Sequence, residues 1–137
     1  MRRRTMLAAL LVLPVVAACE KESQPMTPQS DRDLDAKLAE LRDSGGSAPL
    51  RTLTSFDWDA VYCYYEGARA DDVNNEVGET VLRAGSRLMV TGALAVFTSG
   101  GTVTRVLVVP ELVFTPGRQP AGTGVLVEKG MSLVNPG

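Results

Sequence analysis

The spacing of apolar residues changes along the chain, from a helical period near its start to a strand period farther on. Residues 31–46 begin with aspartates, carry Leu34, Leu38 and Leu41 at helical spacing, and end in two glycines. Together, the N-terminal aspartates, the apolar stripe and the final glycines predict one short amphipathic helix. Such a stripe is typical of a helix that packs on its own domain, and docking on a partner protein is the alternative.

Residues 58–65 contain the next strong pattern, a run of aromatic and β-branched residues that predicts a strand. Successive side chains of a strand point to opposite faces. One face would therefore carry Val61, Cys63 and Tyr65, and the other Tyr62 and Tyr64. Large side chains on both faces suit a central strand that is covered on both sides.

A second short helix is predicted within "ARADDVNNEVG", residues 68–78. Asp71 is a suitable N-cap, and Gly78 is suited to a left-handed C-terminus. Val73 and Val77 lie four residues apart, which places them on one helical face.

Beyond residue 87 the pattern is that of strands. A glycine pair in the turn at 99–101 separates two β-rich runs, 87–98 and 102–115, and predicts a β-hairpin. Pro110 has no N–H to donate, so the second strand would lie at a sheet edge or carry a bulge there. The other segments are interpreted as loops at 47–55 and 116–122, a last strand at 123–130 and a frayed tail at 131–137. The sequence thus predicts an α+β fold in which two short helices pack on one face of a small, mainly antiparallel sheet.

The N-terminal segment, residues 1–18, has the pattern of a secretory signal peptide. Three arginines precede an apolar run from Met6 to about Val16, and two alanines follow it. This run is well short of the roughly 20 apolar residues that a membrane-spanning helix needs. The segment therefore predicts export without a permanent span.

Cys19 follows the two alanines, and the tetrapeptide "VAAC" resembles the lipobox of bacterial lipoproteins. The resemblance implies cleavage before Cys19 and attachment of acyl chains such as palmitate to it; an ordinary secretory signal is the alternative. Several acyl chains hold a protein at a bilayer essentially permanently. Glu20 stands where an aspartate would resemble an inner-membrane retention signal. We therefore expect an anchor on the extracytoplasmic side of the bacterial membrane, and on the periplasmic side of the outer membrane in a Gram-negative host.

The segment after the signal peptide divides into a tether and a domain. Residues 19–31 are polar, contain Pro25 and Pro28 and lack an apolar period, which is typical of a flexible tether. Residues 32–137 have the length of a single small domain.

Composition excludes several classes of function. Of the 137 residues, 119 remain after removal of 1–18, and they carry 11 basic and 16 acidic side chains, a net charge of −5. Nucleic acids and anionic headgroups are held chiefly by Lys and Arg clusters, so neither is an expected ligand. Histidine is absent from the chain, which removes the usual base of Ser and Cys hydrolases and the commonest zinc ligand. We expect no metal, no cofactor and no enzyme activity.

Two aspartates, Asp57 and Asp59, are the candidates for carboxylate chemistry. On an extended chain they would project on the same side, about 7 Å apart, a separation at which an acid and a base can work together. No histidine or phosphate-binding glycine loop accompanies them. A solvated turn before the strand is therefore favoured over a small hydrolase or lyase.

Cys63 is the second of only two cysteines. With Cys19 lipidated, no intrachain disulfide would form. No helix N-terminus or histidine lies near Cys63 in sequence to lower the pKa of its thiol, so a small core residue is favoured over a reactive thiol.

Trp58, Tyr62 and Tyr64 are the candidate binding surface, because aromatic side chains supply much of the contact energy in protein interfaces. Core packing is the alternative. The acidic group Asp71, Asp72, Glu76 and Glu79 lacks the ligand spacing of a calcium loop and is interpreted as a solvated helix face.

The stretch "FDWDAVYCY" followed by "GARADDVNNEVG" resembles a group of small uncharacterised bacterial lipoproteins. In them an aromatic-Asp-Trp-Asp-x-Val-Tyr strand leads through a loop into a short helix that ends in glycine. The matching residues are Phe56, Trp58, Asp59, Val61, Tyr62, Gly67, Val73 and Gly78. The resemblance implies no activity.

Together these features predict a lipid-anchored, non-catalytic module for interaction or envelope maintenance, which would bind an envelope protein or polymer. The alternatives are a hydrolase or lyase that uses Asp57 and Asp59, and a carrier for an apolar ligand between helix and sheet.

Overall fold

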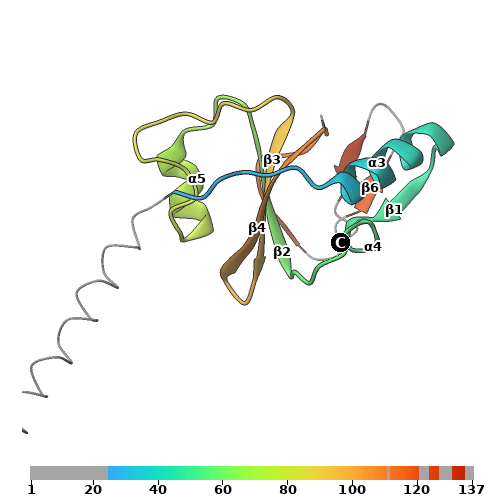
Figure 1. Ribbon diagram of the computed structural model, residues 1–137, viewed down its shortest axis with the longest axis horizontal. Helices are drawn as coiled ribbons and strands as arrows, with labels where there is room; N and C mark the ends of the chain where they lie inside the picture. The colour runs from blue at the N-terminus through green and yellow to red at the C-terminus, as the bar shows by residue number, and fades with distance from the viewer. Residues whose placement is uncertain (1–24, 111, 121–123, 127–130, 135–137) are drawn as a thin grey trace, which may run out of the picture.

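The computed structural model describes residues 25–110, 112–120, 124–126 and 131–134 (Figure 1). The predicted signal peptide, Cys19 and the first part of the predicted tether lie outside these ranges. No helix in the described ranges is long and apolar enough to cross a membrane.

The fold is α+β, as predicted, and is built on a four-stranded antiparallel sheet with the strand order β4-β3-β2-β5. A second, three-stranded sheet has the order β1-β6-β7. The elements are α3 (Arg32–Ser44), β1 (Ser47–Pro49), α4 (Leu50–Leu53), β2 (Ala60–Tyr65), α5 (Ala70–Val77), β3 (Ala93–Ser99), β4 (Thr102–Val109), β5 (Gly117–Pro120), β6 (Gly124–Leu126) and β7 (Ser132–Val134).

The predicted β-hairpin is formed by β3 and β4, with Ser99 paired to Thr102. Gly100 and Gly101 form its turn, at φ 60° and 83°. Positive φ at both central residues is what a tight hairpin turn needs, and glycine adopts it without strain. Strand β4 lies at the edge of the sheet and ends just before Pro110, in agreement with the prediction for that proline.

The first predicted helix is confirmed, including both of its ends. In α3 the Asp31 carboxylate accepts a hydrogen bond from the Leu34 N–H (3.1 Å), and the Gly45 N–H donates to the Leu41 carbonyl (2.9 Å). These contacts satisfy backbone groups that have no partner inside the helix.

The second predicted helix is confirmed as α5, which ends at Gly78 in the left-handed conformation (φ 92°). The predicted N-cap is wrong, because the helix already begins at Ala70, with Arg69 as its N-cap. Asp71 lies in the first turn instead, and its carboxylate accepts a hydrogen bond from the Gly85 N–H (3.2 Å).

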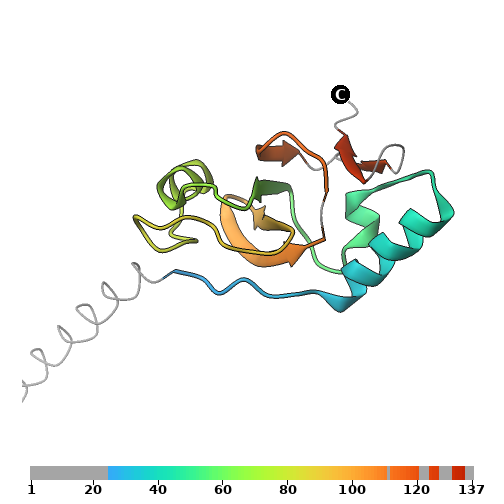
Figure 2. The same cartoon turned by 90° about the horizontal axis from the view of Figure 1, so that it is seen from above.

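The helices do not share one face of the main sheet, which corrects the prediction that both pack on the same side. Leu34 and Leu38 of α3 belong to the apolar cluster that contains Cys63 of β2. Val73 and Val77 of α5 belong to the cluster that contains Tyr64. Neighbouring residues of a strand face opposite ways, so the two clusters lie on opposite faces. Figure 2 shows α5 on one side of the sheet and α3 with α4 on the other.

Three segments interpreted as loops or tail contain regular structure. Residues 47–55 contribute β1 and α4, and 116–122 contributes β5, in which Gly117 pairs with Cys63. The predicted tail 131–137 contributes β7, beside the β6 strand that falls within the predicted strand 123–130. β1 pairs with β6 across nearly eighty positions of sequence, as in Ser47 with Leu126. Local patterns do not report such distant pairings.

Part of the predicted tether is built into the fold. The Gln29 N–H donates to the Val106 carbonyl (3.0 Å), and the Gln29 carbonyl accepts from the Val108 N–H (2.8 Å). The Met26 N–H donates to the Val81 carbonyl (2.9 Å). Residues 25–30, hereafter the edge segment, therefore run along β4 and are not a free tether; Figure 1 shows them crossing in front of the sheet. They cover backbone groups that an edge strand otherwise leaves unpaired.

We predict that Gly92→Ala destabilises the protein by about 2–4 kcal/mol, because strain and a clash act together. Gly92 has φ 105°, and a Cβ atom there would overlap the Val109 carbonyl oxygen. Gly46→Ala is the matched control, since Gly46 has a similar φ of 97° but open space around a Cβ atom. It should cost only the conformational strain, about 1–2 kcal/mol. Urea denaturation, followed by circular dichroism, measures the stability of both variants. Equal losses of stability would contradict the close approach of Gly92 to the Val109 carbonyl.

Candidate functional site

The three aromatic residues predicted as a binding surface do not form one. Trp58 is 2% exposed and Tyr64 is 5% exposed, and only Tyr62 is half-buried. Trp58 lies in the cluster on the α3 side of the sheet, whereas Tyr62 and Tyr64 face the α5 side. The prediction is wrong because both faces of this strand are covered, which favours the alternative of core packing.

Trp58 is fixed in the core by specific contacts. Its indole N–H donates to the Thr54 hydroxyl (2.9 Å), and its ring meets Phe97 edge to face, with 5.2 Å between ring centroids. The guanidinium of Arg51 donates to the Trp58 carbonyl (2.5 Å) and lies over the indole ring at 5.4 Å. Trp58 is therefore an anchor for the segment that leads into β2.

Tyr64 is tied to α5 across the other face of the sheet. Its hydroxyl donates to the Glu76 carboxylate at 2.5 Å. Burial, followed by this hydrogen bond to a charged acceptor, raises the pKa of Tyr64 well above its ordinary value. The phenol therefore stays protonated and connects the strand to the helix.

Asp57 and Asp59 are both exposed, and Asp59 has a structural partner. The Asp59 carboxylate accepts a hydrogen bond from the Gly100 N–H (2.7 Å), and the Asp59 N–H donates to the Thr98 carbonyl (2.9 Å). Asp59 thus fastens the turn of the β3–β4 hairpin to the start of β2. This is a structural use of the carboxylate, and it does not pair Asp59 with Asp57.

Cys63 is buried, 3% exposed, on the α3 side of β2. Burial away from solvent disfavours the thiolate and raises the pKa of the thiol to about 12. The geometry is that of the small core residue favoured by the sequence.

Three of the four acidic residues of the 71–79 region act as hydrogen-bond acceptors for their surroundings. Asp71 accepts from Gly85, Glu76 from the Tyr64 hydroxyl, and Glu79 from the Val103 N–H (2.6 Å). Among the residues that the structure describes, no three His, Cys, Asp or Glu side chains are grouped so as to hold a metal ion.

Asn74 is a structural residue that sequence reasoning missed, because asparagine within a predicted helix only weakens that prediction. Its side-chain carbonyl accepts from the N–H groups of Val81 (2.8 Å) and Leu82 (2.9 Å), and its amide donates to the Leu82 carbonyl (2.8 Å). It holds the loop after α5 against the helix.

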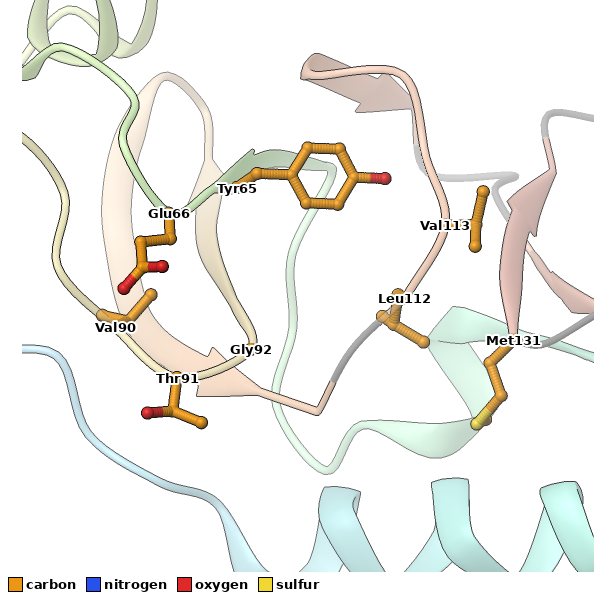
Figure 3. A pocket seen from close by; sticks show the side chains of 8 residues that line it. All are labelled: Tyr65, Glu66, Val90, Thr91, Gly92, Leu112, Val113 and Met131. Carbon is orange, nitrogen blue, oxygen red and sulfur yellow. The ribbon is translucent and has the colours of Figure 1, made fainter.

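A hollow of about 550 Å³ lies at the end of β2, where the main sheet meets the segment before β5. We call it the Tyr65 hollow. Figure 3 shows the residues that line it, which come from the end of β2 and the turn after it, from the loop before β3, from the segment between β4 and β5 and from the position just before β7: Tyr65, Glu66, Val90, Thr91, Gly92, Leu112, Val113 and Met131. Its volume falls in the range of about 300–1,000 Å³ that is typical of ligand pockets.

The Tyr65 side chain, which lines this hollow, is held in its orientation by several contacts. Its hydroxyl donates to the Phe114 carbonyl (3.0 Å) and accepts from the Phe114 N–H (2.8 Å). The two rings also stack, with centroids 4.0 Å apart. A side chain that is 38% exposed is thus held in one position, which lowers the entropy cost of binding against it.

Val113 provides the most exposed apolar side chain of the hollow, at 55%. Its backbone is nevertheless fixed, because its N–H donates to the Met131 carbonyl and its carbonyl accepts from the Leu133 N–H, both at 2.7 Å. Val113 therefore offers an apolar group to the hollow from a backbone position that is fixed.

The sequence contained one weak signal for this site. Tyr65 is the last residue of the predicted strand, and Glu66 and Gly67 form a turn after it, where the cover over a strand ends. The contributions of Val113 and Met131 depend on pairing with β7 and had no local signal.

Comparison of the chain with protein-family models, with curated proteins and with solved structures found no match.

We predict that Tyr65→Phe lowers the free energy of unfolding by about 1–2 kcal/mol. The change keeps the stack on Phe114 but removes two hydrogen bonds of the hydroxyl to the Phe114 backbone. Tyr62→Phe is the matched control, since no hydrogen bond of the Tyr62 hydroxyl is seen in the described ranges, and it should change stability by less. Urea denaturation of both variants measures these changes. If Tyr65→Phe left the free energy of unfolding unchanged, the hydroxyl would not hold the ring.

We also predict that Cys63 resists alkylation in the folded protein. With a thiol pKa of about 12 and a buried sulfur, iodoacetamide at pH 8 should leave it unmodified for hours, and unfolding in urea should expose it within minutes. Mass spectrometry of the peptide that contains Cys63 measures this. Rapid labelling without urea would show that the strand opens or that the thiol is reactive.

Proposed function

We propose that this protein is a lipid-anchored, non-catalytic module that binds a partner in the bacterial envelope through the Tyr65 hollow. The observation that carries the proposal is the hollow itself, with its rigid, partly exposed Tyr65 and Val113 at the end of the central strand. The anchor is inferred from the sequence, in which Cys19 follows a charged start and an apolar run.

The surroundings of the candidate residues favour binding over catalysis. The Asp59 carboxylate already accepts a hydrogen bond from the hairpin turn, and the Cys63 thiol is buried and protonated. General acid or base catalysis needs a group within reach of a substrate, and neither residue lines the Tyr65 hollow.

The lining of the hollow favours a partner with polar groups over a simple acyl chain. Glu66 and Thr91 line it beside Val90, Leu112 and Val113, so both polar and apolar atoms are offered. A peptide segment of an envelope protein satisfies both kinds of group, whereas an acyl chain would leave the polar groups unpaired. This weighs against the alternative of an apolar-ligand carrier.

The test is crosslinking in the native host, followed by affinity capture and mass spectrometry. We expect specific envelope proteins with the wild type, and their loss with Val113→Asp, because a charge on this exposed position disfavours apolar contact without disturbing the core. Cys19→Ala should also abolish capture, because the protein would leave the membrane.

Thr102→Asp is the matched control. Thr102 is exposed at the hairpin turn, at the end of β3–β4 opposite to the hollow. Capture that survives Val113→Asp unchanged would contradict binding at the hollow, and absence of any enriched protein with the lipidated wild type would contradict a stable partner.

A further inference from the structure

The Tyr65 hollow has a neighbour on the other side of the same residues. A second hollow of about 380 Å³ is lined by Tyr64, Tyr65, Glu66, Ala68, Arg69, Asp72, Val73, Glu76 and Pro116. We call it the acidic hollow. Tyr65 and Glu66 line both hollows, so the two adjoin at the end of β2, and we describe them as the two halves of one candidate site.

The two halves of this site differ in chemistry. In the Tyr65 hollow, Val90, Leu112 and Val113 supply aliphatic walls beside the aromatic ring. In the acidic hollow, three carboxylates, on Glu66, Asp72 and Glu76, outnumber the single guanidinium of Arg69. A ligand that matches both halves would carry a positive charge close to an apolar group.

The carboxylates are not equivalent. Glu76 already accepts the Tyr64 hydroxyl, which fixes its position on the wall. Glu66 and Asp72 are exposed, and in the described ranges no hydrogen bond to either carboxylate is seen. Glu66 and Asp72 are therefore the groups available to a cation, with Glu66 at the junction of the two halves.

The segment before β5 already covers β2 at this place. The ladder between β2 and β5 ends at the pair of Cys63 and Gly117. Beyond this pair, Pro116 lines the acidic hollow and Phe114 stacks on the Tyr65 ring, so the chain itself occupies the side on which the ladder would continue. A peptide would therefore be held by the side chains of the two hollows and not by pairing with β2.

We propose that the site at the end of β2 binds a peptide segment in which a basic residue lies beside an apolar one. The basic side chain would meet Glu66 and Asp72, and the apolar one would enter the Tyr65 hollow. This rests on the proposed function and names the chemical class of its partner. The partner contact would depend on salt, because exposed charge pairs are screened.

The test is fluorescence anisotropy with the full lipidated chain in a neutral detergent. The probes are a labelled hexapeptide of alternating lysine and leucine and its glutamate–leucine counterpart. We expect the wild type to prefer the lysine peptide, and Glu66→Gln with Asp72→Asn to raise its Kd about threefold to tenfold. Glu40→Gln with Asp43→Asn is the matched control, because it removes the same charge from exposed positions of α3 and should leave the Kd unchanged.

A charge exchange keeps the test independent of any loss of folding. Glu66→Lys with Asp72→Lys should reverse the preference, so that the glutamate peptide binds more tightly than the lysine peptide. Equal effects of the two neutralising pairs would reveal non-specific attraction and would overturn the proposal, as would equal binding of both peptides to the wild type. If the peptides fail while capture in the host still depends on Val113, only the basic-peptide chemistry is wrong and the proposed function stands.

Discussion

Burial of both faces of β2 is the constraint on which the rest of the structure depends. Val61 and Cys63 on one face and Tyr64 on the other are each under 6% exposed. Each face therefore requires its own cover, since every buried side chain needs close-packed neighbours. Helix α3, α4 and the small sheet supply one cover, and α5 with the loop held by Asn74 supplies the other.

Four polar contacts of the domain hold this same strand. Arg51 binds the backbone at Trp58 before the strand, and Asp59 fastens the neighbouring hairpin to its start. The Tyr64 hydroxyl joins it to α5, and the Tyr65 hydroxyl joins its last residue to the segment before β5. Carboxylates and phenols that resemble reactive groups in the sequence are thus used to position one strand. The exception is the turn after the strand, where Glu66 remains exposed beside the two hollows.

The features that the sequence predicted well are those whose signals are local. The limits of α3 follow from Asp31 and Gly45, and the β3–β4 turn follows from its glycine pair, because capping and turn geometry depend on a few adjacent residues. The sheet β1-β6-β7 could not be predicted, since each strand has only three residues and its partners lie far away in the chain. For the same reason both helices were assigned to one face of the sheet. The same limit applies to the candidate site. The alternation of side chains along the strand correctly assigned the faces of residues 61–65. Only the tertiary structure decides that Trp58 is buried and that Tyr65 is not.

The attachment of the edge segment to β4 limits how far the domain could move from the proposed lipid anchor. If Cys19 is held in the bilayer, as we propose, only the residues from Glu20 to Met26 separate the lipid from the first backbone hydrogen bond to the domain. Even fully extended, a chain of that length spans at most about 25 Å. The domain would therefore work as a fixture of the membrane surface, within roughly its own diameter of the headgroups, and a partner would have to come to the membrane to meet it.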